Sequence, residues 1–381
     1  MYSLDPAIFA SQLIQCPSIT PTEGGALDLL QSTLENLGFV CTRYPFEEVD
    51  NLYARLGTIA PNFCYAGHTD VVPIGNRDDW DHDPFGGVID DGILWGRGAA
   101  DMKGGIAAFV SAIAALLNSG WTPNGSISFL ITGDEEGPAL NGTKKVLTAI
   151  TEAGEIIDHC LVGEPTNPNT LGEMMKIGRR GSLNGIITVT GTQGHVAYPD
   201  LAGNPVPILL KILTALTTKQ LDTGNDNFQA SNLEVTSVDV NNPAHNIIPQ
   251  SATAKFNIRF NTEHTGDDLL DWLEGELTIA RREFKGIIAA DLTVPGHPFL
   301  TVPCQFSDYL SAAIKDVTGL TPKLSTSGGT SDARFITHYA PVIEFGLIGK
   351  TIHQVNEHAN VDDINNLCEI YQSLLRRYFS R

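Results

Sequence analysis

Gly133-Asp134-Glu135-Glu136-Gly137 directly follows the apolar run Ser126-Ile127-Ser128-Phe129-Leu130-Ile131-Thr132. The run has the length and the β-branched and aromatic content of a buried strand. Successive side chains of an extended chain point to opposite faces, so Glu135 and Glu136 cannot easily share one task. Such a pair suits a division of labour in which one carboxylate binds a metal and its neighbour moves a proton. Taken alone, the triplet is better interpreted as an inert, solvated acidic turn, and only further ligands at the ends of other strands favour the metal site.

Length and charge limit the classes of function. With 381 residues the chain exceeds the size at which a single hydrophobic core keeps growing, so we expect two domains. Acidic residues outnumber basic ones 44 to 24, which gives a formal net charge of −20. A protein without a basic excess does not neutralise phosphates, and we therefore expect no nucleic-acid partner. An anionic substrate would have to be captured by local arginine, lysine or metal.

The cysteines and the N-terminal residues indicate the compartment. The six cysteines are scattered without a Cys-x-x-Cys pair, so we predict no disulfide framework. Met1-Tyr2-Ser3-Leu4-Asp5-Pro6 has no basic n-region, and we expect no signal peptide. No apolar run approaches the ~20 residues of a membrane span. We therefore expect a cytoplasmic protein with no membrane partner.

Three further polar residues follow apolar strands or open a helix. His68 ends the run Phe63-Cys64-Tyr65-Ala66-Gly67, and Asp70 stands where it could accept the second ring N–H of a metal-binding imidazole. Asp101 lies in a glycine-rich turn before an alanine-rich helix, predicted over 106–117. Glu164 follows the strand predicted over 160–163. A phosphate cradle at 96–105 is the alternative, but the spacing fits neither a Walker loop nor a dinucleotide fingerprint.

The order of the predicted elements indicates the fold class. Alternating strands and helices favour an α/β sheet whose ligands gather at its carboxyl edge. Between residues 180 and 293 the pattern changes to β-α-β-β-α-β, which is typical of a ferredoxin-like domain. We therefore predict a catalytic domain over 1–179 and 294–381, with a mixed sheet flanked by helices, and an inserted α+β domain over 180–293.

The candidate ligands are two imidazoles and three carboxylates: His68, Asp101, Glu136, Glu164 and His353. This set exceeds the needs of one tetrahedral zinc. It suits two metal ions that share one carboxylate and lie roughly 3.5–4 Å apart, as in two-metal hydrolases.

Four segments resemble the signature blocks of the di-zinc deacylase and aminoacylase metallopeptidase family: Gly67-His68-Thr69-Asp70-Val71-Val72-Pro73, Gly96-Arg97-Gly98-Ala99-Ala100-Asp101-Met102-Lys103-Gly104, Gly133-Asp134-Glu135-Glu136-Gly137 and Gly163-Glu164-Pro165. Two more segments are similar to the branch that hydrolyses N-succinyl-L,L-2,6-diaminopimelate: Ser327-Gly328-Gly329-Thr330-Ser331-Asp332-Ala333-Arg334-Phe335 and His353-Gln354-Val355-Asn356-Glu357. The matching segments run from residue 67 to residue 357 and so cover essentially the whole chain.

The resemblance implies a role for each ligand. It assigns His68 and Glu164 to one zinc, Glu136 and His353 to the other, and Asp101 to the bridge. Two zinc ions per chain are implied, with cobalt able to substitute. Glu135 is the implied general base, and we count Asp70 with it among the catalytic residues. The resemblance also implies a cis peptide bond after Asp101.

The resemblance also implies how substrate is held and how the reaction runs. The matching substrate-binding positions are Arg179, Asn246, Arg259, Thr330 and Arg334. His195 matches an insert-domain histidine that reaches the active site of the partner subunit in a homodimer formed through the insert. In the implied reaction, Glu135 takes a proton from a zinc-activated water and passes it to the leaving amine, while one zinc and His195 stabilise the oxyanion. Gly349 departs from the pattern, because some members have a substrate-contacting asparagine there.

Three functions fit these residues. The first releases succinate and L,L-diaminopimelate in lysine and diaminopimelate biosynthesis. The second applies the same metal chemistry to another N-acyl amino acid, such as acetylornithine, or to a dipeptide, and the loop Gly328-Gly329-Thr330-Ser331-Asp332 argues against it. The third is a non-catalytic metal-binding homologue with an assembly role. It would be favoured if Glu135 or a ligand were replaced, and none is.

Overall fold

The computed structural model describes residues 4–380, so Met1–Ser3 of the N-terminal stretch discussed above lie outside the described residues. The chain forms two compact units. The first contains the residues up to Ile177, Thr301–Ser325 and the residues from Ser331 onward, and the second contains Gly178–Leu300 and Thr326–Thr330. We expected the loop 326–330 in the catalytic domain. It clusters instead with the second unit because Thr326 Oγ1 donates to the carbonyl of Asn227 and Arg179 Nη1 donates to that of Gly329.

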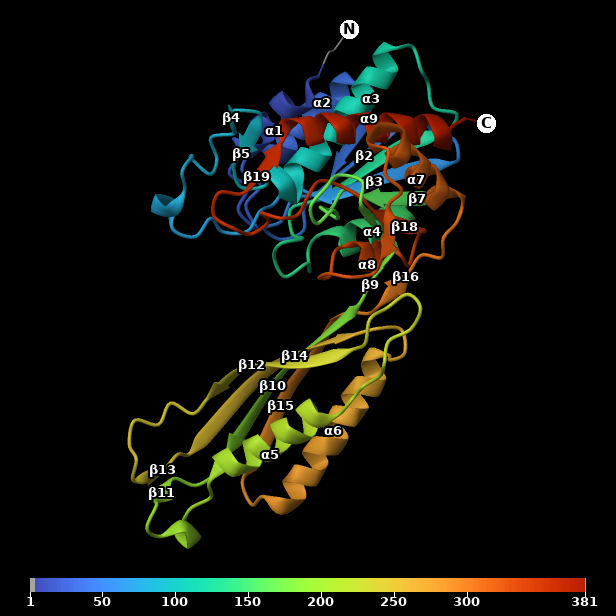
Figure 1. Ribbon diagram of the computed structural model, residues 1–381. Coiled ribbons are helices and arrows are strands. Elements are labelled where there is room, and N and C mark those ends of the chain that lie inside the picture. The colour runs from blue at the N-terminus through green and yellow to red at the C-terminus, as the bar shows by residue number, and fades with distance from the viewer. Residues whose placement is uncertain (1–3, 381) are drawn as a thin grey trace. The chain divides into compact units, whose positions relative to one another are not determined.

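A mixed sheet forms the centre of the first unit (Figure 1). Its strand order is β1-β2-β6-β3-β7-β18-β8-β17, and the four central strands run parallel to one another. These four are β6 (Ser126–Thr132), β3 (Asn62–His68), β7 (His159–Val162) and β18 (Val342–Glu344). The outer strands are β1 (Val40–Arg43), β2 (Leu52–Leu56), β8 (Met174–Lys176) and β17 (Lys323–Ser325).

Helices cover both faces of this sheet, and every residue of β3 and β6 is buried as a result. The helices of the first unit are α1 (Pro6–Ile14), α2 (Ala26–Asn36), α3 (Gly104–Asn118), α4 (Thr143–Glu152), α7 (Gln305–Thr318), α8 (Ala333–Ile336) and α9 (Val361–Tyr378). The alanine-rich α3 packs against α1 and α9, and α9 packs against α7.

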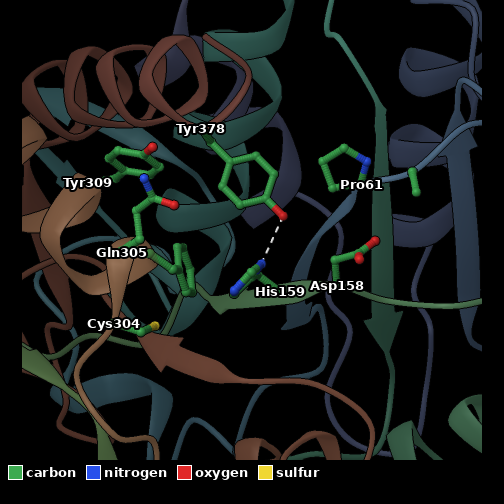
Figure 2. A pocket seen from close by; sticks show the side chains of 9 residues that line it. Pro61, Asp158, His159, Cys304, Gln305, Tyr309 and Tyr378 are labelled. Atoms are coloured by element: carbon green, nitrogen blue, oxygen red, sulfur yellow. Dashed lines mark hydrogen bonds between the residues drawn. The ribbon is translucent and has the colours of Figure 1, made fainter. Parts of the chain in front are cut away.

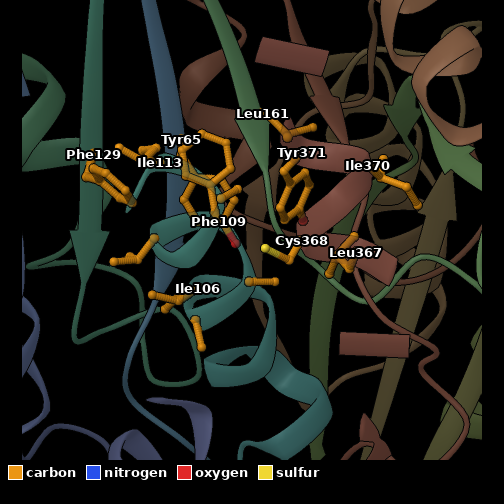
Figure 3. Packing of buried hydrophobic residues seen from close by; sticks show 14 of the residues in the cluster. Tyr65, Ile106, Phe109, Ile113, Phe129, Leu161, Leu367, Cys368, Ile370 and Tyr371 are labelled. Carbon is orange, nitrogen blue, oxygen red and sulfur yellow. The ribbon is translucent and has the colours of Figure 1, made fainter. Parts of the chain in front are cut away.

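Aromatic side chains join the sheet to α3 and α9 (Figure 3). The rings of Tyr65 on β3 and Phe109 on α3 stack with centroids 4.2 Å apart, and Phe109 meets Tyr371 of α9 edge-on at 5.2 Å. The Tyr371 hydroxyl donates to the carbonyl of Phe345 at 2.7 Å. Such pairs add about 0.5–1.5 kcal/mol each beyond the burial of their area, so they hold the strands that carry the candidate ligands.

The helical stretch Ala99–Asn118 corrects one expectation. It is long and apolar enough to cross a membrane, although we expected no such run, and 89% of its apolar window is buried inside the protein. Its composition reflects its place between the sheet and neighbouring helices.

The second unit is a four-stranded antiparallel sheet of order β12-β14-β10-β15, packed against two helices (Figure 1). Its elements are β10 (Gly181–Thr190), α5 (Pro205–Thr218), β12 (Asn232–Asp239), β14 (Ser251–Phe260), α6 (Gly266–Glu283) and β15 (Ile287–Gly296). Burial alternates along β14, as expected for a sheet with one covered face. The predicted α/β class with a ferredoxin-like β-α-β-β-α-β insert is confirmed.

Short strand pairs complete the two units. In the first, β4 (Val88–Asp90), β5 (Ile93–Trp95) and β19 (His358–Asn360) form a three-stranded sheet. In the second, β9 (Gly178–Arg179) pairs with β16 (Phe299–Leu300), and β11 (Gly194–His195) pairs with β13 (Ile247–Ile248). All six cysteines, which lie in the described part of the chain, are free thiols.

Candidate metal centre

The site begins where two neighbouring parallel strands end. His68 is the last residue of β3 and lies opposite Thr132, the last residue of β6. Glu135 and Glu136 follow Thr132 in the next turn, and so they emerge at the same edge of the sheet as the imidazole.

The orientation of His68 is fixed by a backbone carbonyl. The ring Nδ1 lies 2.9 Å from the carbonyl oxygen of Asp70, to which it donates, and Nε2 is left free to bind a cation. We predicted that the Asp70 carboxylate would accept this proton, and that detail is wrong. The carboxylate oxygen is 3.7 Å from Nδ1, because its two oxygens accept from the backbone N–H groups of Glu135 and Glu136 at 3.2 and 3.0 Å.

Asp101 lies between two histidines. Its Oδ1 is 3.3 Å from Nε2 of His68, and its Oδ2 is 3.4 Å from Nε2 of His353. Glu164 Oε1 lies 3.6 Å from the same atom of His68, and Glu136 Oε1 lies 2.9 Å from that of His353. The five predicted ligands therefore converge as two imidazole–carboxylate pairs on either side of one shared carboxylate.

The donor set fits divalent cations. Nε2 of His68 and Oδ1 of Asp101 are buried and have no hydrogen-bond partner among the described residues. Ligand atoms of His68, Glu135 and Glu164 lie within 4.8 Å of one another, as do those of His68, Asp101 and Glu136. Buried charges are stable only when they are paired or coordinate a metal. The four carboxylates of this cluster carry the charge that two divalent cations would balance.

The turn that presents Asp101 depends on a glycine. Gly98 has φ +90°, and a Cβ at this position would lie 2.9 Å from Cγ1 of Val71. The peptide bond between Asp101 and Met102 is cis, as the resemblance implied. The next residues start α3, so the carboxylate is held by a helix that is itself buried.

The charges in the site shift one another's proton affinities. Burial raises the pKa of Glu135 well above its usual range, and the charge of Glu164 adds to the rise. Hydrogen bonds to Asp101 and Glu136 raise the pKa of His353 to about 10. Glu135 and His353 therefore bind their protons more tightly than the free side chains do. Cation binding would displace those protons, and the metal affinity is expected to rise with pH.

One of the five predicted substrate-binding residues belongs to the first unit. Nη1 of Arg334 donates to the carbonyl of Ser331 at 3.3 Å, and its guanidinium lies over the ring of Phe335. The buried carboxylate of Asp332 lies 3.6 Å from Nη2 of Arg334, and its charge contributes to the raised pKa of Glu135. Arg334 is therefore part of the surroundings of the metal centre.

The other four belong to the second unit, together with His195. Nη1 of Arg179 donates to the carbonyl of Gly329, next to Thr330, at 3.2 Å. Arg259 lies on β14, opposite Ser182 of β10.

His195 and Asn246 lie side by side in the second unit. The N–H of Val196 donates to the carbonyl of Asn246 at 3.1 Å, and both the histidine and the asparagine are exposed. In the second unit, Arg179 thus contacts the residue before Thr330, His195 lies beside Asn246, and Arg259 lies on a strand.

A separate hollow of about 310 Å³ lies at the other end of β7 (Figure 2). His159 Nδ1 and the Tyr378 hydroxyl lie 2.9 Å apart beside it. Because His159 starts β7 whereas Glu164 follows the end of that strand, this hollow is not part of the metal centre.

A family model described as Peptidase family M20/M25/M40 matches residues 64–377, which is most of the chain. The chain belongs to this peptidase family. The succinyl-diaminopimelate desuccinylase of Maricaulis maris (strain MCS10) is 58% identical over 375 residues, which cover 98% of this chain and 96% of the relative. The protein of the same name from Caulobacter vibrioides (strain NA1000 / CB15N) is 55% identical over 99% of this chain and 97% of the relative.

Solved structures of M20 proteins share the fold. The M20 family metallo-carboxypeptidase Sso-CP2 of Sulfolobus solfataricus matches with a TM-score of 0.83 at 20% identity, over 99% of this chain and 100% of that protein. Bacillus subtilis YXEP, described as a dinuclear metal binding peptidase from the M20 family, matches with a TM-score of 0.73 at 14% identity, over 98% of both chains. Family membership and the ligand geometry confirm the prediction of a metal-dependent hydrolase.

Two positions of this M20 chain add to what the sequence indicated. At Gly349, an added Cβ would lie 3.3 Å from the carbonyl oxygen of Pro165, so a larger residue would press on the segment after Glu164. Glu357 received no role from the sequence, yet its buried carboxylate accepts from the N–H groups of Ala100 and Asp101. The sequence feature that could have indicated a role for Glu357 is its position four residues after the predicted ligand His353.

Proposed function

We propose that this chain hydrolyses the amide bond of N-succinyl-L,L-2,6-diaminopimelate, giving succinate and L,L-diaminopimelate for lysine and diaminopimelate biosynthesis. The observation that carries this proposal is that relatives named succinyl-diaminopimelate desuccinylase match nearly the whole chain at 51% to 58% identity. The proposed location is the cytoplasm.

The proposed cofactors are two zinc ions per chain, with cobalt able to substitute. His68 and Glu164 would hold one ion, Glu136 and His353 the other, and Asp101 both. The support is the placement of the two Asp101 oxygens, each within 3.4 Å of a different imidazole nitrogen. When bound, the ions would lower the pKa of a water molecule toward neutrality and polarise the scissile carbonyl.

Glu135 is the proposed general base. Its carboxylate takes a proton from the attacking water and then delivers it to the leaving amine nitrogen, which departs as the C–N bond breaks. A raised pKa suits a group that must both accept and release a proton near neutral pH. Asp70 assists by fixing the backbone of Glu135 and Glu136 through their N–H groups.

The substrate carries three carboxylates, which the chain must bind despite its net charge of −20. Arg179, Arg259 and Arg334 are the proposed carboxylate partners, because guanidinium groups bind carboxylates in a bidentate manner. The polar groups of Asn246 and Thr330 complete the proposed substrate set.

A homodimer through the second unit is also proposed. Strand β15 pairs only with β10 among the described strands, so its other edge has backbone groups that a second copy could use. In this dimer, His195 of one subunit would stabilise the oxyanion in the site of the other.

The substrate assignment is tested by measuring succinate release from N-succinyl-L,L-diaminopimelate, with N-acetylornithine and a dipeptide as matched alternatives. We expect turnover of the succinyl substrate alone, and its loss in the presence of a chelator. Faster turnover of acetylornithine or the dipeptide would contradict the assignment. Metal analysis of zinc-loaded protein should approach two equivalents per chain, and a plateau at one with full activity would contradict the dinuclear centre only.

A further inference from the structure

The loops that carry Asp101 and His353 start from one strand pair. Strands β5 and β19 are antiparallel, with Trp95 opposite His358, and beyond them the N–H of Gly96 donates to the carbonyl of Glu357 at 2.9 Å. From this point the chain runs forward to Asp101 and back to His353. We call residues 96–101 the Asp101 arm and residues 353–357 the His353 arm. The two ligands therefore lie on neighbouring arms that start at the same strand pair.

The carboxylate of Glu357 binds the Asp101 arm. It is 1% exposed and accepts from Nη1 of Arg97 at 2.8 Å and from the N–H of Gly98 at 3.1 Å. Its second oxygen accepts from the N–H groups of Ala100 and Asp101, both at 3.1 Å. Three backbone N–H groups of the turn that presents Asp101, those of Gly98, Ala100 and Asp101, thus donate to one side chain.

Arg97 binds the His353 arm in return. Its Nη1 also donates to the carbonyl of Gln354, the residue after His353, at 3.1 Å. The side chain is 3% exposed, and its guanidinium lies 5.2 Å from the centre of the Trp80 ring. Glu357 lies on the His353 arm and binds the Asp101 arm. Arg97 lies on the Asp101 arm and binds the His353 arm.

The backbone of the His353 arm requires such support. His353 and Asn356 have φ values of +60° and +61°, in the left-handed region that side-chain-bearing residues rarely adopt. Backbone of this kind persists only where the surroundings hold it, at a cost of about 1–3 kcal/mol per residue. Asn356 is fixed by a pair of hydrogen bonds to Asp81, at 2.7 and 2.8 Å.

We propose that Glu357 and Arg97 are positioning residues of the metal centre, whose crossed contacts set the separation of Asp101 and His353 and thereby the affinity for divalent cations. Neither residue is a ligand. The proposal rests on the proposed metal site but not on the proposed substrate, because cation binding can be measured without any substrate.

The test is a zinc titration of metal-free protein in competition with a chromogenic chelator. Glu357→Gln keeps the size of the side chain but turns an N–H₂ group toward donors that need an acceptor. We expect the zinc affinity to fall by about 10–100-fold, the range found when groups behind metal ligands are replaced.

Glu155→Gln is the matched control. It removes the carboxylate paired with Arg55, whose strand position is opposite Ser128 near the start of β6, at the other end of the sheet from the ligands. This variant should lower the melting temperature while the zinc affinity stays within twofold of the wild type.

A second variant keeps the test decisive if Glu357→Gln does not fold. Arg97→Lys retains the charge next to Glu357 but lacks the planar guanidinium, in which Nη1 donates to both Glu357 and the carbonyl of Gln354 while Nη2 donates to the carbonyl of Pro73 at 3.4 Å. We expect an intermediate loss of zinc affinity. An affinity within twofold of the wild type in folded Glu357→Gln, or in Arg97→Lys if the first variant does not fold, would overturn the proposal.

Discussion

At the scale of single residues, Asp70 shows how a carboxylate can act on a neighbour through the backbone. Its oxygens hold the N–H groups of Glu135 and Glu136, the proposed base and a proposed ligand. Burial raises its pKa to about 6, although these donors oppose the rise. An uncharged acceptor would hold the acidic pair less firmly.

We predict that Asp70→Asn lowers kcat by about 10–100-fold, because one of the two carboxylate acceptors becomes a donor. The zinc content should stay near that of the wild type, since the backbone carbonyl of Asp70 still orients His68. Steady-state kinetics and metal analysis of one preparation check both parts. Loss of zinc together with activity would mean that the side chain supports the ligand itself.

Glu135→Gln should nearly abolish turnover and leave the metal content intact, because the amide has the same shape but cannot accept a proton. General-base catalysis contributes ~10²–10⁴-fold, and we expect a fall in kcat of at least that size. Glu136→Gln serves as the comparison, since it should reduce metal binding as well. A fall of less than tenfold for Glu135→Gln would remove its proposed role.

At the scale of elements, hydrophobic patterns were enough to predict the strands that carry the ligands. The run 126–132 and the run ending at His68 are continuously apolar because helices cover both sheet faces, and such runs are recognisable without tertiary information. The hard ligands that follow these strands and the other loops indicate a two-metal site, and the resemblance then implies which ion each ligand would hold. The acceptor for Nδ1 of His68 was not predictable, because a backbone carbonyl and a carboxylate two residues away are equally near in sequence.

Contacts between distant loops were equally inaccessible. The segment 326–330 clusters with the second unit, and its hydrogen bonds to Asn227 and Arg179 leave no periodic signal in the sequence. Glu357 presents the same difficulty, because its partners lie 256 to 260 positions away.

The loop between α5 and β12 offers a test of stability against pH. Burial would raise the pKa of Asp222, but hydrogen bonds from Ser231, Gly224 and Asn261 outweigh it and lower the pKa. A carboxylate with a lowered folded pKa stabilises the protein above its unfolded pKa of ~3.9, and this contribution is lost as the pH falls through the folded value.

We predict that Asp222→Asn lowers stability at pH 7 by about 1–3 kcal/mol, through loss of charge-assisted hydrogen bonds. The difference in melting temperature from the wild type should shrink as the pH falls below ~4. Thermal scans between pH 7 and pH 3 measure it. A difference that stays constant over that range would show that the charge of Asp222 does not stabilise the loop.

At the scale of the whole molecule, the proposed dimer can be tested by combining two inactive chains. His195→Ala should lower kcat by about 10²–10³-fold with little change in zinc content, as expected for a lost oxyanion donor. In a heterodimer of Glu135→Gln and His195→Ala chains, one site combines an intact Glu135 with an intact His195 of the partner subunit. We expect roughly half the activity of a wild-type dimer from that count of sites.

The matched control is the homodimer of each variant, purified in the same way. A stable heterodimer without recovered activity would mean that His195 acts within its own chain or has no part in the reaction.

The polypeptide passes between its two units at four places rather than two, because Thr326–Thr330 leaves the first unit and returns to it within five residues. A simple insertion would require only two joints. If the codons for Gly178–Leu300 were deleted, Thr326–Thr330 would remain in the chain without its hydrogen-bond partners Asn227 and Arg179. When genes of this kind are recombined, Gly178–Leu300 therefore cannot be exchanged by itself. The codons for Thr326–Thr330, which follow after 25 intervening codons, have to be exchanged with it.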